Sequence, residues 1–179
     1  MHLCCKYWLI ILSNVKNKNS TCINAFKLNS GTFVLGDSHS VSVYHPGGNI
    51  SRNDGKTLFG VMKEGMQTYI PEGTTHLITY FGNIDVRHHL CRQEKPVDAT
   101  KKLVKNYFEH LKSLNIEKIS VVKLLPIEFE ERRIPKTGYY KGTPFIGSQR
   151  ERTQLMQIFN EEVENLSAIY NMNVIEWPN

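Results

Sequence analysis

Two short apolar stretches each break at a glycine and continue into a cluster of polar, titratable residues. Residues 32–40 read T-F-V-L-G-D-S-H-S, and residues 79–92 read T-Y-F-G-N-I-D-V-R-H-H-L-C-R. Runs of this kind are typical of parallel strands, whose carboxyl ends carry the loops that bind ligands. If the two strands are neighbours, their polar residues share one crevice. The sequence therefore predicts a functional site at one edge of a parallel sheet, without yet defining its chemistry.

Strand-like and helix-like patterns alternate along the rest of the chain. Apolar residues recur at helical spacing over residues 100–114, whereas residues 76–81 and 119–125 are short, mostly apolar runs of the kind found in buried strands. Pro126 ends the second run, and a last strand is expected at 174–177. This alternation predicts a three-layer α/β/α sandwich with a mainly parallel sheet.

A second long helix is predicted to begin after Ser148, because Ser148 and Glu151 have the spacing of a capping box. Its expected core face consists of Leu155, Ile158, Phe159, Val163, Leu166, Ile169 and Tyr170. Residues 45–55 and 128–147 are dense in turn-forming or charged residues and are expected to be loops.

The chain of 179 residues is long enough for one domain with its own hydrophobic core. Residues 1–31 are predicted to form an N-terminal extension, and residues 32–179 the α/β domain. The apolar run at 7–12 is too short to span a bilayer, which needs about 20 apolar residues. We expect it to be a buried strand within the extension.

The chain is mildly basic, with a formal net charge of +5 and a pI of about 9.0. This excess suits an anionic substrate or partner, but it is not gathered into a basic run, so nucleic acid is not the expected partner. The cysteines fit no zinc or disulfide pattern; they are Cys4, Cys5, Cys22 and Cys91. Free thiols in a reducing compartment are expected, which predicts a cytoplasmic protein.

Residues 36–40 read G-D-S-H-S after the first strand, and residues 81–89 read F-G-N-I-D-V-R-H-H after a central one. In this order the two motifs resemble a branch of the SGNH/GDSL hydrolase superfamily that reads G-D-S-H-S and F-G-x-I-D-x-R-H-H. Weaker likeness covers residues 52–57 and residues 144–148, which lead into Arg152. The resemblance runs from Thr32 to Trp177 and implies an SGNH-like, flavodoxin-like sandwich.

The resemblance also implies a serine hydrolase that acts on esters, often acyl groups on carbohydrates, and that requires no cofactor or metal. Ser38 would be the nucleophile, assisted by residues among Asp85, His88 and His89. The residues implied around the substrate and the oxyanion hole are Asp37, His39, Gly48, Gly55, Gly82, Asn83 and Arg87. The backbone N–H of Ser38 and that of Gly48 or Gly55 would hold the oxyanion, where each fixed donor contributes about 10²–10³-fold in rate. The expected partner is a small-molecule or carbohydrate ester.

The sequence departs from the superfamily pattern in two places. Where a G-x-N-D block has its asparagine this chain has Ile84, with Asn83 one position early, and Arg87 or a neighbouring histidine is the conjectured donor instead. The superfamily also takes its base from a C-terminal D-x-x-H block, which does not follow the last predicted strand. Three explanations stand. The base is His39, His88 or His89; or the protein binds a ligand without hydrolysing it; or the sequence lacks its natural C-terminus.

A metal-dependent phosphoesterase is a second enzymatic interpretation, because Asp37 and His39 have the Asp-x-His spacing of a metal-binding pair. The Asn-His and Gly-His-x-His motifs of that class do not occur in the sequence. Structural roles are the simpler alternative: Ser38 could cap a helix, and Asp85 and Arg87 could pair at a helix start. If the site exists, one pocket should be lined by Asp37, Ser38, His39, Asp85, Arg87 and His88.

Overall fold

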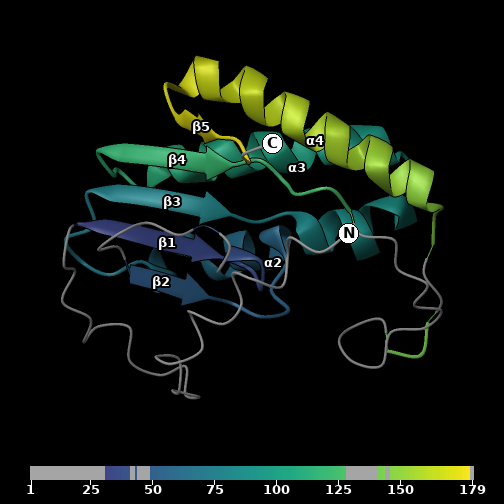
Figure 1. The fold of residues 1–179 in the computed structure, drawn as a ribbon, viewed down its shortest axis with the longest axis horizontal. Helices are drawn as coiled ribbons and strands as arrows, with labels where there is room; N and C mark the ends of the chain where they lie inside the picture. The colour runs from purple at the N-terminus through teal and green to yellow at the C-terminus, as the bar shows by residue number, and fades with distance from the viewer. Residues whose placement is uncertain (1–30, 41–42, 44–48, 128–140, 144–145, 178–179) are drawn as a thin grey trace.

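A five-stranded parallel sheet forms the centre of the computed structural model, which describes residues 31–40, 43, 49–127, 141–143 and 146–177. The strand order is β2-β1-β3-β4-β5. The strands are β1 (Thr32–Gly36), β2 (Asn49–Arg52), β3 (His76–Tyr80), β4 (Lys118–Val122) and β5 (Asn173–Ile175). All the arrows in Figure 1 point the same way, so the carboxyl ends of the strands meet at one edge. The predicted α/β class with a parallel sheet is confirmed, whereas residues 1–30 of the predicted extension lie outside the described residues.

Three helices connect successive strands: α2 (Leu58–Glu64), α3 (Pro96–Ser113) and α4 (Gln149–Tyr170). Between β3 and α3 the chain forms a π-helix, Asp85–His89, and a short 3₁₀ turn, Leu90–Arg92; another 3₁₀ turn, Met66–Tyr69, follows α2. The connections from β2 to β3, from β3 to β4 and from β4 to β5 all run along the sheet in the same direction, away from β2. Because such crossovers are right-handed, the three helices share one face of the sheet. Contacts of α3 with both α2 and α4 agree with this arrangement (Figure 1).

The hydrophobic core lies between this helical layer and the sheet. All five residues of β1 are buried, as are the last four of β3 and of β4, which is why these strands read as mostly apolar runs. The largest fully buried side chains come from both layers: Tyr80, Phe81, Tyr107, Phe108 and Phe159. The core therefore fixes β1 and β3, the two strands whose ends carry the polar blocks.

Residues Asn49–Arg52 form the edge strand β2, so the loop predicted over 45–55 was wrong at this point. β2 pairs with β1 in parallel register, from Phe33 opposite Asn49 to Gly36 opposite Arg52. Its one apolar residue, Ile50, is 41% exposed, so no buried alternation marks the strand in the sequence. Backbone pairing, rather than side-chain burial, defines this strand.

Several predicted boundaries also differ from the structure, those of the first long helix and of β4 among them. The first long helix begins at Pro96 rather than Thr100, because proline is well suited to the first helical position, where no N–H partner is needed. β4 ends at Val122, although the apolar run continues to Leu125. Beyond Val122 side chains satisfy the backbone: the Leu124 N–H donates to Asn160 Oδ1 at 2.7 Å and the Leu125 N–H to the Tyr80 hydroxyl at 3.3 Å.

The capping box of α4 is confirmed. Ser148 Oγ accepts a hydrogen bond from the Glu151 N–H at 3.2 Å, and the Glu151 carboxylate accepts one from the Ser148 N–H at 2.7 Å. The predicted core face is wrong at Ile169, which is 74% exposed. Ser167 is buried instead, because its hydroxyl donates to the Val163 carbonyl at 2.7 Å and so needs no water.

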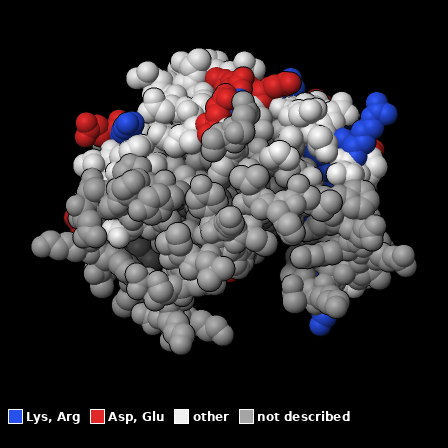
Figure 2. Space-filling model, in the orientation of Figure 1, with Lys and Arg blue, Asp and Glu red and all other residues white. Residues whose placement is uncertain are grey.

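Figure 2 shows charged side chains mainly along the upper part of the face in view, above the residues drawn in grey. Acidic side chains gather over α4 and β5, and the basic side chains in view lie apart from one another. Lys123 pairs with Glu164 of α4 and with Glu176, the residue after β5. In the described part of the chain, no helix combines the length and apolar character that crossing a membrane requires.

Candidate active site

The two polar blocks meet at the carboxyl edge of the sheet (Figure 1). β1 and β3 are hydrogen-bonded neighbours with Gly36 opposite Tyr80, and the Asp37 N–H donates to the Tyr80 carbonyl at 3.1 Å. In sheets of this strand order the connections diverge between these two strands, and ligands bind in the crevice that opens there. The two strands that carry the polar blocks are therefore neighbours, which was the condition for a shared crevice.

Gly36 is required by the close packing at this edge. A Cβ atom on Gly36 would lie 2.5 Å from the Ser40 Cβ and 2.6 Å from the Tyr80 carbonyl oxygen, which is too close for any side chain. The Asn53 N–H donates to the Gly36 carbonyl at 2.8 Å and ties the end of β2 to the same point. The chain can therefore turn sharply after β1 and place the next three residues at the crevice between β1 and β3, where the strand connections diverge.

These three residues join a hydroxyl, an imidazole and a buried carboxylate. Asp37 is fully buried; its Oδ1 accepts from the His39 N–H at 2.8 Å and lies 3.2 Å from His39 Nδ1. Ser38 Oγ is 3.4 Å from the same Nδ1. The His39 side chain is 29% exposed. The Ser38 N–H takes part in none of the hydrogen bonds among the described residues, which leaves it able to bind a developing oxyanion.

Tyr80, the last residue of β3, was not predicted as part of the site but lies at its centre. Its ring contacts His39 edge-on, with the ring centroids 6.3 Å apart, and contacts Trp177 in the same way at 5.7 Å. Its hydroxyl accepts hydrogen bonds from the Leu125 N–H and from the Asn83 amide. Burial raises the pKa of the Tyr80 phenol, so the hydroxyl is protonated at neutral pH. The only sequence signal for this role was its position at the strand end.

Asn83 and Gly82, both predicted near the oxyanion hole, have structural partners. The Asn83 side chain is buried and its amide donates to the Tyr80 hydroxyl, so in this structure it fixes Tyr80. Gly82 has a φ of +117°, and a Cβ there would lie 2.6 Å from the Phe159 ring. Of the two loop glycines, Gly55 has a φ of +75° and open space around it, and Gly48 lies outside the described residues.

Asp85 is buried at the N-terminus of α2. Its carboxylate accepts from the Leu58 N–H at 2.7 Å and from the Phe59 N–H at 3.4 Å, while Thr57 Oγ1 accepts from the Gly60 N–H at 2.9 Å. Burial raises the pKa of Asp85 to about 6, against the opposing effect of these hydrogen bonds, and the negative charge of Asp37 raises it further. Asp85 therefore caps a helix and interacts electrostatically with the group around Ser38.

Asp85 should make stability fall as pH rises through the acidic range. An aspartate ordinarily has a pKa of 3.8, whereas the pKa of Asp85 is about 6, so between these values the folded state binds more protons than the unfolded state. The free energy of unfolding of the wild type, relative to Asp85→Asn, should therefore decrease by about 2 kcal/mol from about pH 4 to about pH 7. Urea unfolding of both proteins across this range measures the difference; a difference that is constant or that grows with pH would contradict the assignment.

Arg87, His88 and His89 lie on the π-helix and are half-buried. Burial, and then the charge of Arg92, lower the pKa of His89, so its imidazole is neutral at neutral pH. The charge of Arg87 acts on Tyr80, where it opposes the larger effect of burial on the phenol pKa. Among the described residues, no hydrogen bond joins these three side chains to Ser38. Their predicted roles at the site stay predictions.

The described residues do not assemble the ligands of a metal centre. Asp37 and His39 are joined to each other by hydrogen bonds, and Asp85 is bound to the backbone of α2. Within this part of the chain no group of three His, Cys, Asp or Glu side chains is arranged to hold a metal ion. The donor set of a binuclear phosphoesterase is thus not formed from these residues.

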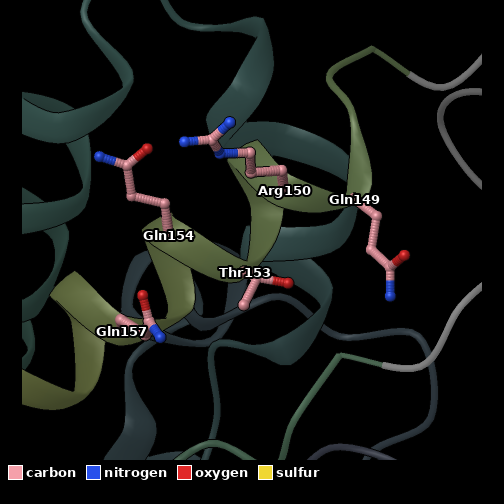
Figure 3. Close-up of a pocket in the computed structure, with 5 residues that line it drawn as sticks. All are labelled: Gln149, Arg150, Thr153, Gln154 and Gln157. Atoms are coloured by element: carbon pink, nitrogen blue, oxygen red, sulfur yellow. The ribbon is translucent and has the colours of Figure 1, made fainter.

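A surface depression lies on the first turns of α4, away from the polar blocks in sequence. Figure 3 shows the side chains that line it, which are Gln149, Arg150, Thr153, Gln154 and Gln157. None of these is a predicted site residue.

At the carboxyl edge the structure brings Asp37, Ser38 and His39 into contact and couples Asp85 to them through charge. The single pocket predicted for all six residues stays a prediction.

The structure resembles solved hydrolases at low sequence identity. A GDSL-like lipase from Bacteroides thetaiotaomicron VPI-5482 superposes with a TM-score of 0.53 and 18% identity over 81% of this chain and 67% of that one. A protein from Bacteroides fragilis NCTC 9343 assigned as an acylhydrolase superposes with a TM-score of 0.50 and 13% identity over 81% of this chain and 66% of that one. This chain thus spans about two thirds of their length.

No protein-family model matches the sequence, and no curated protein matches it either. At identities this low, the structural likeness establishes the fold and not the residues of the site. The sheet order, the parallel register and the flanking helices agree with that likeness. The chain therefore has the α/β fold of the SGNH hydrolases, with a five-stranded parallel sheet and flanking helices.

Proposed function

We propose that this protein hydrolyses esters, or transfers their acyl groups, with Ser38 as the nucleophile and a nearby histidine as its base. One observation carries the proposal. Ser38 Oγ, at the crevice between β1 and β3, lies 3.4 Å from an imidazole nitrogen that also contacts a buried carboxylate. A serine hydroxyl becomes a useful nucleophile only beside such a base. The fold shared with a GDSL-like lipase supports the same chemistry.

The substrate we propose is an acylated carbohydrate or a related small ester in the cytoplasm. The sequence motifs resemble a branch of hydrolases for which such substrates are implied, and the half-exposed His39 leaves its side of the site open to a polar ligand. The mild positive charge of the chain is compatible with an ester that carries an anionic group.

The proposal can be tested by covalent labelling and by a choice of substrates. The protein is incubated with a fluorophosphonate, and the labelled peptide is identified by mass spectrometry; labelling at Ser38 is expected. Turnover of p-nitrophenyl acetate in the presence of a chelator is then compared with turnover of p-nitrophenyl phosphate with added Mn²⁺. Chelator-resistant acetate hydrolysis supports the serine mechanism. Phosphate hydrolysis that depends on Mn²⁺, without labelling, would reject it in favour of the metallophosphoesterase.

A ligand-binding protein without hydrolytic activity is the second candidate, and a specific observation favours it. Ser38 Oγ and Asp37 Oδ1 both approach the same nitrogen of His39, so the imidazole cannot bridge them through its two nitrogens as in a catalytic triad. Binding of acetylated sugars, measured by calorimetry, together with the absence of both labelling and turnover, would support this function instead.

A further inference from the structure

The chain holds the serine, the imidazole and the carboxylate in consecutive positions, and they converge on a single atom. His39 Nδ1 lies 3.4 Å from Ser38 Oγ and 3.2 Å from Asp37 Oδ1. A neutral imidazole nitrogen either accepts or donates a hydrogen bond, and it cannot do both at once. An unprotonated Nδ1 can accept from Ser38 Oγ at this distance, and a protonated Nδ1 can donate to Asp37 Oδ1.

We propose that His39, acting through Nδ1, is the general base for Ser38, so that residues 37–39 form a self-contained nucleophile, base and counter-ion. This inference rests on the proposed function and identifies the base that the proposed function leaves open. Removal of the Ser38 proton puts a positive charge on the imidazole, 3.2 Å from the Asp37 carboxylate. Charge-assisted hydrogen bonds are stronger than neutral ones, so Asp37 favours the state in which His39 holds the proton.

Asp37 is well suited to this role because its carboxylate accepts few other hydrogen bonds among the described residues. Its Oδ1 receives the His39 N–H at 2.8 Å, and its Oδ2 is buried with no hydrogen-bond partner among the described residues. A buried carboxylate is stabilised only by pairing and hydrogen bonds. The contact with His39 is therefore a large part of what stabilises the Asp37 charge, and a proton arriving at Nδ1 strengthens that contact.

The His39 imidazole also packs against the Tyr80 ring. The Tyr80 ring meets it edge-on, and Tyr80 is itself fixed by the Leu125 N–H, the Asn83 amide and the ring of Trp177. Trp177 is anchored by a hydrogen bond from its Nε1 to the Lys123 carbonyl at 2.6 Å. His39 is thus the histidine that the carboxyl edge orients toward Ser38, with Tyr80 and Trp177 as positioning residues.

The proposed steps balance with water as the only co-reactant. As Ser38 Oγ bonds to the ester carbonyl carbon, its proton passes to Nδ1 and the carbonyl electron pair moves onto oxygen. When the tetrahedral intermediate collapses, the alkoxy group leaves and takes the proton from Nδ1 as an alcohol. Water then attacks the acyl group, gives its proton to Nδ1, and Ser38 Oγ leaves and recovers that proton. The sum is ester and water going to acid and alcohol.

The deciding variant is His39→Asn, because the asparagine amide can donate to Asp37 from near the position of Nδ1 but cannot take a proton. We expect kcat/KM for p-nitrophenyl acetate to fall about 10²–10⁴-fold. The rise of the rate with pH that reflects deprotonation of an imidazole should also disappear. His76→Asn is the matched control, because His76 lies at the opposite edge of the sheet and contacts Ser120. It should keep both the rate and the pH profile.

Chemical rescue gives a second readout that a structural role would not produce. In His39→Ala, added imidazole should restore part of the lost rate, increasingly as its neutral fraction rises with pH. Full activity in His39→Asn, with loss in His88→Asn or His89→Asn, would overturn the inference and leave Ser38 as the nucleophile. Wild-type protein that neither turns over the ester nor is labelled at Ser38 would overturn the proposed function as well.

Discussion

Ser38→Ala is expected to lower kcat/KM for p-nitrophenyl acetate by about 10⁴-fold or more. Without Oγ no acyl-enzyme forms, and the imidazole 3.4 Å away has no hydroxyl to deprotonate. The variant should fold normally, because Ser38 is half-buried and its hydroxyl makes only the 3.4 Å contact with His39. The bonds from the Asp37 N–H to Tyr80 and from the His39 N–H to Asp37 do not involve that hydroxyl. Circular dichroism together with steady-state kinetics separates the two effects.

Ser40→Ala is the matched control for this result. Ser40 lies two residues further along the same turn and is fully buried, and its hydroxyl has no hydrogen-bond partner among the described residues. Its removal should leave the rate within a few-fold of wild type. A similar loss of activity in both variants would mean that disturbing the turn, and not the loss of a nucleophile, lowers the rate. Retention of activity in Ser38→Ala would reject Ser38 as the nucleophile.

Gly82→Ala is expected to destabilise the protein by about 3 kcal/mol or more, which is the largest stability effect that we predict. Two costs combine at this residue. The φ of +117° is unfavourable for any residue with a Cβ, and that Cβ would lie 2.6 Å from the fully buried Phe159 ring. A backbone shift at Gly82 would also disturb the start of the π-helix, because the Val86 N–H donates to the Gly82 carbonyl at 2.9 Å. Chemical denaturation followed by far-ultraviolet circular dichroism measures the change.

Gly73→Ala separates the two costs. Gly73 has a φ of +82° but open space where a Cβ would be, so its replacement should cost only about 1 kcal/mol. The excess in Gly82→Ala then reports the clash with Phe159, and Phe159→Leu should recover part of that excess when the two changes are combined. Equal effects at Gly73 and Gly82 would show that the ring moves aside at no cost.

The sequence predicted the elements that have a clear local pattern of residues and missed those that lack one. β1 and β3 were predicted because each is a continuous buried apolar run, and the capping box of α4 because its two residues lie three positions apart. β2 was missed because a half-exposed edge strand gains its identity only by pairing with β1. Ile169 was misassigned because helical periodicity gives the direction of a side chain but not where the sheet beneath the helix ends.

The residues of the candidate site also fall into those that the sequence predicted and those that it did not. From the sequence, Asp37, Ser38 and His39 were predicted to lie at a strand end near the block that contains Asp85, because the carboxyl ends of parallel strands share one edge. The contacts of Tyr80 could not be predicted, since its hydroxyl and ring meet Leu125, Asn83 and Trp177, which are remote in sequence or have no distinguishing local pattern.

The sequence by itself determined the alternating α/β architecture, the edge that carries the site and the presence of a serine beside an aspartate and a histidine. These depend on periodicity and on neighbouring residues, which a linear chain displays directly. Only the tertiary structure decided that Asp85 caps α2 and that Ser38 and Asp37 converge on one nitrogen of His39. Side-chain directions and burial depend on long-range packing, so the partner of each polar atom becomes defined only when the sheet and its helices have assembled.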